Sequence, residues 1–202
     1  MSRPPAKPIK PERARQFERS GGDVQFDFAS VVTILARDGG RSSVLETQWT
    51  MKLYLDTSVP YLLFADDAPH RRAVTEMFLN WLRRSSDEVY VSSLLEEEIS
   101  YARTDRCATL ISQLQRLPIR MIRMPPESVR LADRYIAEGI VPRKLKCDIL
   151  HVAIAACCGL DVVISWNGAI TNMYRVMRIC EFNSRNGLPL VVVHTPEVAF
   201  RP

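Results

Sequence analysis

The sequence predicts an α/β fold in three layers, in which helices cover both faces of a five-stranded, mainly parallel sheet. Two observations lead to this prediction. From Met51 onward, short strand-forming runs alternate with longer stretches of helical pattern, an order typical of parallel sheets with helical connections. The run DVVISW (161–166) is also apolar almost without interruption, as expected of a parallel strand that is buried on both faces.

Each expected element follows from local composition. Five runs have strand character, at 52–56, 88–92, 119–124, 161–166 and 188–193. Apolar residues at helical spacing predict helices at 58–66, 70–84, 94–103, 105–117, 126–137, 146–158 and 169–180. Proline and glycine mark several boundaries: Pro118 ends one helix, Pro126 opens another, and Gly139 and Gly159 stop two more.

The first fifty residues differ in composition from the rest. The opening MSRPPAKPIKPERARQFERSGGD is rich in proline and charge and almost lacks aliphatic residues, a composition typical of disorder. We therefore expect 1–50 to be disordered or an upstream extension, and 51–202 to be the folded domain. A tail that docks a partner is the alternative. If the tail is dispensable, a chain truncated to begin at Met51 will fold with an unchanged melting temperature.

Net charge alone argues for no particular partner. The chain has 202 residues, a hydrophobic content of 47% and a formal charge of +4. The first fifty residues hold 8 basic and 6 acidic residues, which leaves 19 and 17 for the remainder. Because this remainder is nearly neutral, contact with a nucleic acid would have to come from a local basic patch.

Cysteine usage and hydropathy bear on the compartment. The five cysteines lack paired metal-binding spacing, so we expect free, buried thiols in a reducing cytoplasm. No run reaches the roughly 18 apolar residues of a membrane span, and the N-terminus lacks the apolar core of a signal peptide. The sequence thus predicts a cytoplasmic protein that does not enter a membrane.

Three acids stand where an α/β fold can point them out of the core. Asp56 follows an apolar run, Glu98 lies on the helical segment after the strand at 88–92, and Asp148 opens a strongly apolar helix. Bringing three carboxylates together costs electrostatic repulsion unless a cation lies between them. Hard divalent cations such as Mg²⁺ prefer oxygen ligands, so the pattern suggests metal-assisted cleavage of a phosphodiester.

Each of these acids also has a purely structural explanation. Asp56 could cap the following helix, Glu98 could belong to a solvated helix face, and Asp148 could compensate a helix dipole. His151 could line the same helix face as Asp148, but we expect it to be a partly buried packing residue rather than a catalytic one.

Three further polar residues are candidates. Asn167, after the fourth strand, could ligate a cation or position a water, or simply form a turn before Gly168. Arg143 and Lys144 precede Asp148 and could grip phosphates or solvate a loop.

Five segments in order resemble the PIN-domain nucleases, specifically the VapC-type toxins of type II toxin–antitoxin systems. These segments, which span about Met51 to Phe200, are LYLDTSVPYLLF, VSSLLEEEI, VPRKLKCDILHVAIA, DVVISWN and NGLPLVVVHTPEVAF. The register of the second segment selects Glu98 over its two glutamate neighbours. One departure is Asn167, which stands where many members of the family have an aspartate.

The resemblance implies a three-layer PIN-like domain and a metal-dependent endoribonuclease in which a metal-activated water attacks the RNA phosphodiester. It implies Mg²⁺ or Mn²⁺ as cofactor, a cognate antitoxin as partner, and a homodimer. The implied residues are the metal ligands Asp56, Glu98 and Asp148, Asn167 as a further catalytic residue, and Thr57, Arg143 and Lys144 at the substrate.

Two other functions remain open at this stage. One is a catalytically weak binding module with the same fold, whose acidic pocket accepts a basic side chain of a partner. The other is a nuclease that processes RNA outside toxin–antitoxin systems or acts on DNA. For a nuclease, we expect the carboxylates of Asp56, Glu98 and Asp148 to converge, and their repulsion to raise at least one carboxyl pKa in the metal-free protein.

Overall fold

The computed structural model describes residues 50–101 and 104–200, without the side chains of residues 102–106. The predictions made for the N-terminal segment 1–50 fall almost entirely outside the described residues, so they stay predictions.

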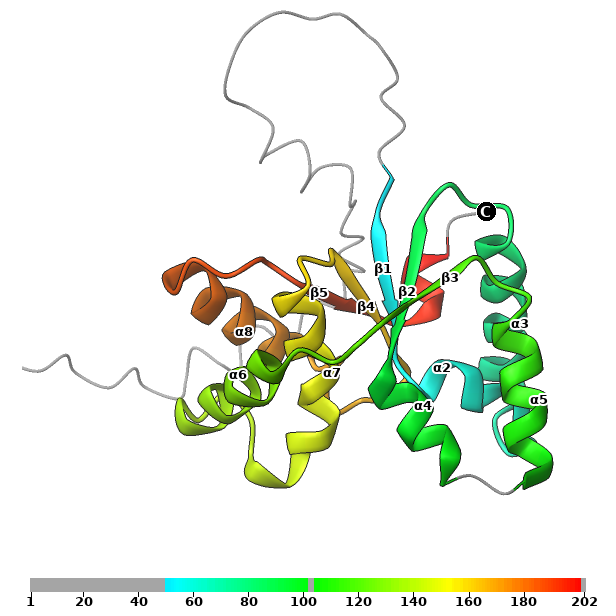
Figure 1. Ribbon diagram of the computed structural model, residues 1–202, viewed down its shortest axis with the longest axis horizontal. Helices are drawn as coiled ribbons and strands as arrows, with labels where there is room; N and C mark the ends of the chain where they lie inside the picture. Colours follow the sequence, from blue (N-terminus) through cyan, green and yellow to red (C-terminus); the bar gives the residue numbers. More distant parts are fainter. Residues whose placement is uncertain (1–49, 102–103, 201–202) are drawn as a thin grey trace, which may run out of the picture. The chain divides into compact units, whose positions relative to one another are not determined.

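A single five-stranded parallel sheet forms the centre of the described chain (Figure 1). The strand order is β3-β2-β1-β4-β5, and every neighbouring pair runs in parallel. The strands are β1 (Lys52–Leu55), β2 (Glu88–Ser92), β3 (Ile119–Ile122), β4 (Val162–Ile164) and β5 (Val192–His194). The predicted fold class is confirmed, and the sheet is wholly parallel.

Helices cover the two faces of the sheet. One face carries α6 (Pro126–Ala137), α7 (Lys146–Cys157) and α8 (Met173–Arg185), on the left in Figure 1. The other carries α2 (Ser58–Tyr61), the 3-10 turn η2 (Leu62–Phe64), α3 (Pro69–Leu82) and α5 (Thr104–Leu114). α4 (Ser93–Ser100) continues directly from β2. The connections from β1 to β2 and from β2 to β3 run one way along the sheet, and those from β3 to β4 and from β4 to β5 run the other way. Right-handed connections therefore place the two sets of helices on opposite faces.

The chain reverses direction across the sheet at β1, which lies between β2 and β4. Leu55 pairs with Ile164 at the carboxyl ends of β1 and β4, and the next residues are Asp56 and Ser165. The backbone N–H of Asp56 still donates to the carbonyl of Ile164, at 3.0 Å. In open parallel sheets, ligands bind beyond the carboxyl ends of strands at such a reversal point. The topology thus puts Asp56 at the edge where a site is expected.

α7 is the most deeply buried helix, as its apolar sequence predicts. Seven of its twelve residues are buried, among them Ile149, Val152 and Ile154. They pack in the core between the sheet, α6 and α8. An acid or a histidine on such a helix has little access to water except at the helix's first turns, which point to the carboxyl edge of the sheet.

The C-terminal part differs in detail from the prediction. α8 begins at Met173 rather than Ala169, because the carbonyl of Asn167 accepts the N–H groups of Ile170 and Thr171 in a separate turn. The side chain of Asn172 then caps α8 by accepting the N–H of Arg175 at 3.1 Å.

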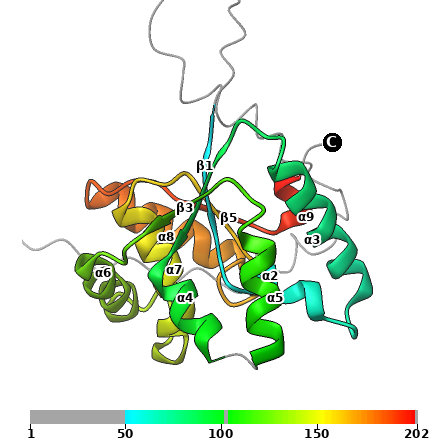
Figure 2. The same cartoon turned by 45° about the vertical axis from the view of Figure 1, so that its right-hand side comes forward.

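Two elements near the end of the chain also depart from expectation. β5 covers 192–194 instead of 188–193, since the backbone N–H of Leu188 donates to Asn183 and closes the end of α8. A short helix, α9 (Pro196–Ala199), was not expected and packs against α3 (Figure 2).

The structure also tests the expectations about the thiols and about membrane-spanning helices. All five cysteines are free thiols, as predicted, but the expectation of burial is wrong: Cys147 is exposed and the other four are only partly buried. Cys147 lies in the first turn of α7, where the helix reaches the surface. None of the helices in 50–101 and 104–200 is both long and apolar enough to cross a membrane.

Candidate functional site

The carboxylate of Asp56 is held by two serine hydroxyls. Asp56 directly follows β1 and is only 4% exposed. Its Oδ2 accepts hydrogen bonds from the Ser58 hydroxyl, at 2.7 Å, and from the Ser165 hydroxyl. Its Oδ1 faces the imidazole of His151, with Nε2 at 3.3 Å. One carboxylate oxygen is thus fixed by the chain, and the other is directed into the site.

Glu98 is the glutamate of α4 that faces the site. Glu96 and Glu97 are exposed, whereas Glu98 is half-buried. Its Oε2 accepts a hydrogen bond from the hydroxyl of Thr57 and lies 3.3 Å from Nε2 of His151. The choice of Glu98 made on sequence therefore agrees with the direction of this side chain. Thr57 contacts the acid rather than open space, which favours a role in orienting Glu98.

His151 lies between the two acids, in a place that sequence reasoning did not give it. It is 2% exposed, and Nε2 is equally far from Asp56 and Glu98. Its other nitrogen, Nδ1, is 2.8 Å from the hydroxyl of Tyr54, which in turn is 2.7 Å from Oγ of Ser92. The expectation of a packing residue is incomplete, because both ring nitrogens have polar partners. The sequence signal that could have indicated this role is the position of His151 three residues after Asp148, which places both on one face of the helix.

The charges around His151 determine the electrostatics of the site. Burial by itself would lower the pKa of His151, but contact with Glu98 and the charges of Asp56, Glu98 and Asp148 raise it overall. Burial would likewise raise the pKa of Glu98, but His151 and the Thr57 hydroxyl lower it overall. The expected rise in a carboxyl pKa is therefore reversed at Glu98, because an imidazole stands where only acids were foreseen.

Asp148 and Asn167 form the second part of the site. The side-chain amide of Asn167 donates to Oδ1 of Asp148 at 2.8 Å. The carbonyl oxygen of the same amide accepts the N–H of Ala169, at 2.9 Å. Asp148 lies in the first turn of α7, one turn before His151. Asn167 thus holds Asp148 in place through its amide NH₂ group, while its side-chain carbonyl oxygen accepts a hydrogen bond within the local turn.

The donor atoms of Asp56, Glu98 and His151 could hold a cation. One ligand atom from each lies within 4.8 Å of the others. Two carboxylate oxygens and an imidazole nitrogen are a donor set that divalent metal ions accept. Asp148, which was expected to converge with the other two acids, is not part of this group, and His151 takes its place; the charge of Asp148 still acts on His151. The arrangement is chemically suited to a hydrated divalent cation.

Arg143 and Lys144 lie on the approach to α7. They belong to the 3-10 turn η3 (Arg143–Leu145) and are exposed. The next basic residue, Lys146, forms an ion pair with Asp133 at 2.6 Å. Arg143 and Lys144 are therefore near the N-terminal end of the helix that carries Asp148, as expected, and their charges face solvent.

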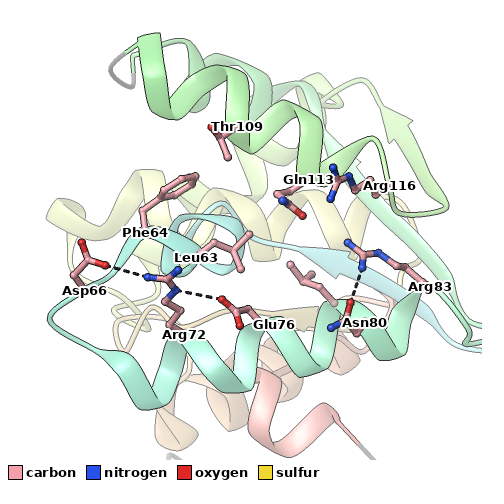
Figure 3. Close-up of a pocket in the computed structure, with 11 residues that line it drawn as sticks. Leu63, Phe64, Asp66, Arg72, Glu76, Asn80, Arg83, Thr109, Gln113 and Arg116 are labelled. Carbon is pink, nitrogen blue, oxygen red and sulfur yellow. Dashed lines mark hydrogen bonds and ion pairs between the residues drawn. The ribbon is translucent and has the colours of Figure 1, made fainter.

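A cavity of about 630 Å³ lies elsewhere, against α3 and α5 (Figure 3). Within it, Arg72 is already paired with Asp66 at 3.0 Å and with Glu76 at 3.2 Å. Its other lining residues come from η2, α3, α5 and the residues just after these two helices: Leu63, Phe64, Leu79, Asn80, Arg83, Thr109, Gln113 and Arg116. This cavity is therefore separate from the cluster around Asp56.

Comparisons with known proteins give a sparse picture. The chain matches no protein-family model and no curated protein sequence. Among solved structures, it is similar to a chain of the VapBC2 complex from Rickettsia felis, described as bound to a DNA fragment from its promoter. The similarity has 13% identity and a TM-score of 0.46, and covers 72% of this chain and 98% of the other. The function must therefore be argued from the chemistry of the site.

Proposed function

We propose that this protein is a divalent-metal-dependent endoribonuclease, and that it acts as the toxin of a toxin–antitoxin pair. The observation that carries the proposal is the convergence of Asp56 and Glu98, from distant segments, on one buried imidazole at the reversal point of the sheet. The resemblance of the sequence motifs to PIN-domain nucleases supports the same conclusion and suggests RNA as the substrate.

The residues fit a divalent cation for a reason independent of that resemblance. Two carboxylates close to one another repel unless positive charge lies between them, and the raised pKa of His151 shows that the acids favour such a charge at this point. A divalent cation would replace the proton there. A bound cation would supply Lewis-acid stabilisation of the phosphate and a nucleophile at neutral pH. Asp56, Glu98 and Asp148 would hold it, with either Mg²⁺ or Mn²⁺ compatible with oxygen ligands.

The neighbouring hydroxyls and the Asn167 amide would keep these acids in position. Ser58 and Ser165 fix one oxygen of Asp56, and Thr57 fixes one oxygen of Glu98. Asn167 does the same for Asp148. Groups that are held in advance of substrate binding do not have to reorganise during the reaction, which lowers the barrier. Asn167 then acts through Asp148 rather than directly on the phosphate.

Arg143 and Lys144 would bind phosphates of the RNA beside the cleaved bond. Both are exposed and lie within five residues of Asp148. Phosphate contacts make binding depend on salt, because each one releases counterions. Arg143→Ala and Lys144→Ala should therefore weaken RNA binding and reduce its salt dependence. Arg130→Ala provides the control, since Arg130 is also exposed but pairs with Glu127 at 3.0 Å.

The test is cleavage of single-stranded and structured RNA by the full-length protein with Mg²⁺ or Mn²⁺. We expect cleavage to stop on addition of a chelator. Glu98→Gln should abolish it, because the amide keeps the shape of the side chain and removes the charge. Glu97→Gln is the matched control: Glu97 is the preceding residue on α4, is exposed, and should tolerate the change.

The outcome also separates the alternatives. Cation binding without cleavage of any RNA would favour the binding module, with a basic side chain of a partner replacing the cation. Cleavage of DNA but not RNA would favour a DNA-acting nuclease. A toxin role further predicts that a co-expressed antitoxin suppresses growth inhibition by the wild-type protein, and that Asp148→Asn removes that inhibition.

A further inference from the structure

We propose that Nε2 of His151 is itself a ligand of the cation, so that the site combines nitrogen and oxygen donors and prefers Mn²⁺ to Mg²⁺. This inference rests on the proposed function in that it concerns the same site. It adds His151 as a ligand, which the resemblance does not imply. It also states which of the two ions, Mg²⁺ or Mn²⁺, binds more tightly.

The distances around Nε2 carry the argument. Nε2 is 3.3 Å from Oδ1 of Asp56 and 3.3 Å from Oε2 of Glu98. A hydrogen bond between a charged donor and a carboxylate is shorter, at about 2.7–2.9 Å. Two ligand atoms at right angles around a cation, each about 2.1–2.2 Å from it, are separated by about 3 Å. The equal and relatively long spacing resembles that of neighbouring ligands more than that of one strong hydrogen bond.

The other side of the imidazole has the partner that a metal-binding histidine needs. Histidines that ligate a metal usually donate their second N–H to an oxygen, which fixes the ring and its tautomer. Here Nδ1 is 2.8 Å from the hydroxyl oxygen of Tyr54, and that hydroxyl can donate onward to Ser92 at 2.7 Å. When a cation replaces the proton on Nε2, the Nε2 lone pair is directed to the space between the two acids.

The ring has little freedom to leave this position. His151 is 2% exposed, and Tyr54 and Ser92 are fully buried. The Tyr54 ring lies 5.7 Å from the imidazole, centroid to centroid. A cation bound between Asp56 and Glu98 would therefore lie within bonding distance of Nε2, since the packing around His151 keeps the ring in this position.

A nitrogen ligand changes which ion binds best. Mg²⁺ favours oxygen ligands and gives up water reluctantly, whereas imidazole suits transition ions. Mn²⁺ accepts both carboxylate and imidazole. The site should therefore bind Mn²⁺ more tightly than Mg²⁺, beyond the difference that carboxylates alone would produce.

Pulsed electron paramagnetic resonance on the Mn²⁺-loaded full-length protein tests the ligand directly. A nitrogen ligand gives a ¹⁴N hyperfine coupling to Mn²⁺. We expect this coupling in the wild-type protein and in His70→Gln, and its loss in His151→Gln. His70 is the matched control, because it is exposed and pairs with Glu197 rather than with the acids of the site. The chain has only three histidines, so the signal can be assigned.

Calorimetric titrations with Mn²⁺ and Mg²⁺ add a second readout. His151→Gln should weaken Mn²⁺ binding about 10-fold or more and affect Mg²⁺ less, so the preference for Mn²⁺ shrinks. Tyr54→Phe should weaken Mn²⁺ binding about 10-fold and keep the ¹⁴N coupling, since it removes an outer partner and not the ligand.

Two results would overturn the inference: wild-type protein that binds Mn²⁺ without ¹⁴N coupling, or coupling that persists in His151→Gln. The wild-type measurement stands even if a variant does not fold. RNA cleavage without the coupling would leave the proposed function intact and remove the ligand. Coupling without cleavage of RNA would support His151 as a ligand and contradict the proposed function.

Discussion

Ser165 donates its hydroxyl hydrogen to Oδ2 of Asp56, and so joins the carboxyl ends of β4 and β1. The same hydroxyl oxygen accepts the backbone N–H of Asn167 at 2.9 Å. One buried serine therefore positions both the acid that follows β1 and the loop that brings Asn167 to Asp148. The two halves of the candidate site depend on each other through this side chain.

Replacing this serine should affect both stability and cation binding. Ser165→Ala leaves a buried carboxylate with one donor fewer and the N–H of Asn167 without its acceptor. We expect a loss of about 1–3 kcal/mol in the free energy of unfolding, measured by urea denaturation. Weaker positioning of Asp56 should also reduce Mn²⁺ affinity, by about 10-fold. Ser100→Ala is the control: Ser100 is exposed, and its hydroxyl donates to the carbonyl of Glu97 on the same helix. Equal effects of the two changes would contradict this role.

The stability of the metal-free protein should fall as the pH rises. The folded state raises the pKa of His151 above its ordinary value of 6.5. A raised pKa means that the folded state binds the proton more tightly, so this stabilisation is complete below about pH 6.5. It is lost as the pH rises through the folded-state pKa. Glu98 works in the opposite direction: its lowered pKa contributes stability above its ordinary value of 4.5, which is lost at more acidic pH.

Melting temperatures of wild-type protein and His151→Gln, measured with a chelator between pH 5 and 9, check this prediction. The advantage of the wild-type protein should be largest in the mildly acidic range and decline at higher pH. An advantage that grows with pH would contradict a protonated imidazole between the acids. Added Mn²⁺ should reduce the pH dependence, because the cation then supplies the positive charge.

The sequence predicted the sheet well because its signals are local. Short strand-forming runs and helix-stopping residues identified all five strands, and the order of strands and helices implied the parallel pairing. The error at β5 has a tertiary cause. LPLVVV is apolar throughout, but its first residues close the end of α8 through Asn183, and only 192–194 pair with β4.

The site was predictable only where its residues are unusual in their surroundings. Asp56 stands out after an apolar strand, and Asp148 stands out on an apolar helix. Glu98 required the family resemblance, because three consecutive glutamates look alike in sequence. His151 fitted an apolar helix as a packing residue, and only the folded chain shows both its ring nitrogens facing polar atoms. Ser58 and Ser165 carried no local signal at all.

Thiol reactivity should follow exposure along the chain. Burial raises the pKa of the thiols of Cys157, Cys158 and Cys180, so they form little thiolate at neutral pH. Cys147 is exposed. We expect iodoacetamide at pH 7.5 to modify Cys147 before these three thiols, as read from the fragment ions of tryptic peptides, since Cys147, Cys157 and Cys158 share one peptide. Unfolding in urea should equalise the four rates. Faster labelling of Cys180 in the folded protein would contradict the packing of α8 against β5.

Asn167→Asp should make the protein less stable without metal and more responsive to it. The amide of Asn167 donates a hydrogen bond to Asp148, which an ionised carboxylate cannot do. The substitution therefore replaces a hydrogen bond by repulsion between two acids, and should lower the free energy of unfolding by about 1–3 kcal/mol in a chelator. Asn167→Ala removes the same hydrogen bond without adding charge, and should cost less.

Addition of Mn²⁺ should stabilise Asn167→Asp more than the other two proteins. A further carboxylate beside Asp148 increases the negative charge on the cation site, so Asn167→Asp should gain more in melting temperature from Mn²⁺ than either the wild-type protein or Asn167→Ala. Thermal melts of the three proteins across a Mn²⁺ titration measure this gain. If Asn167→Asp and Asn167→Ala respond equally to Mn²⁺, then position 167 does not face the cation, and Asn167 serves only to hold Asp148 and its own turn.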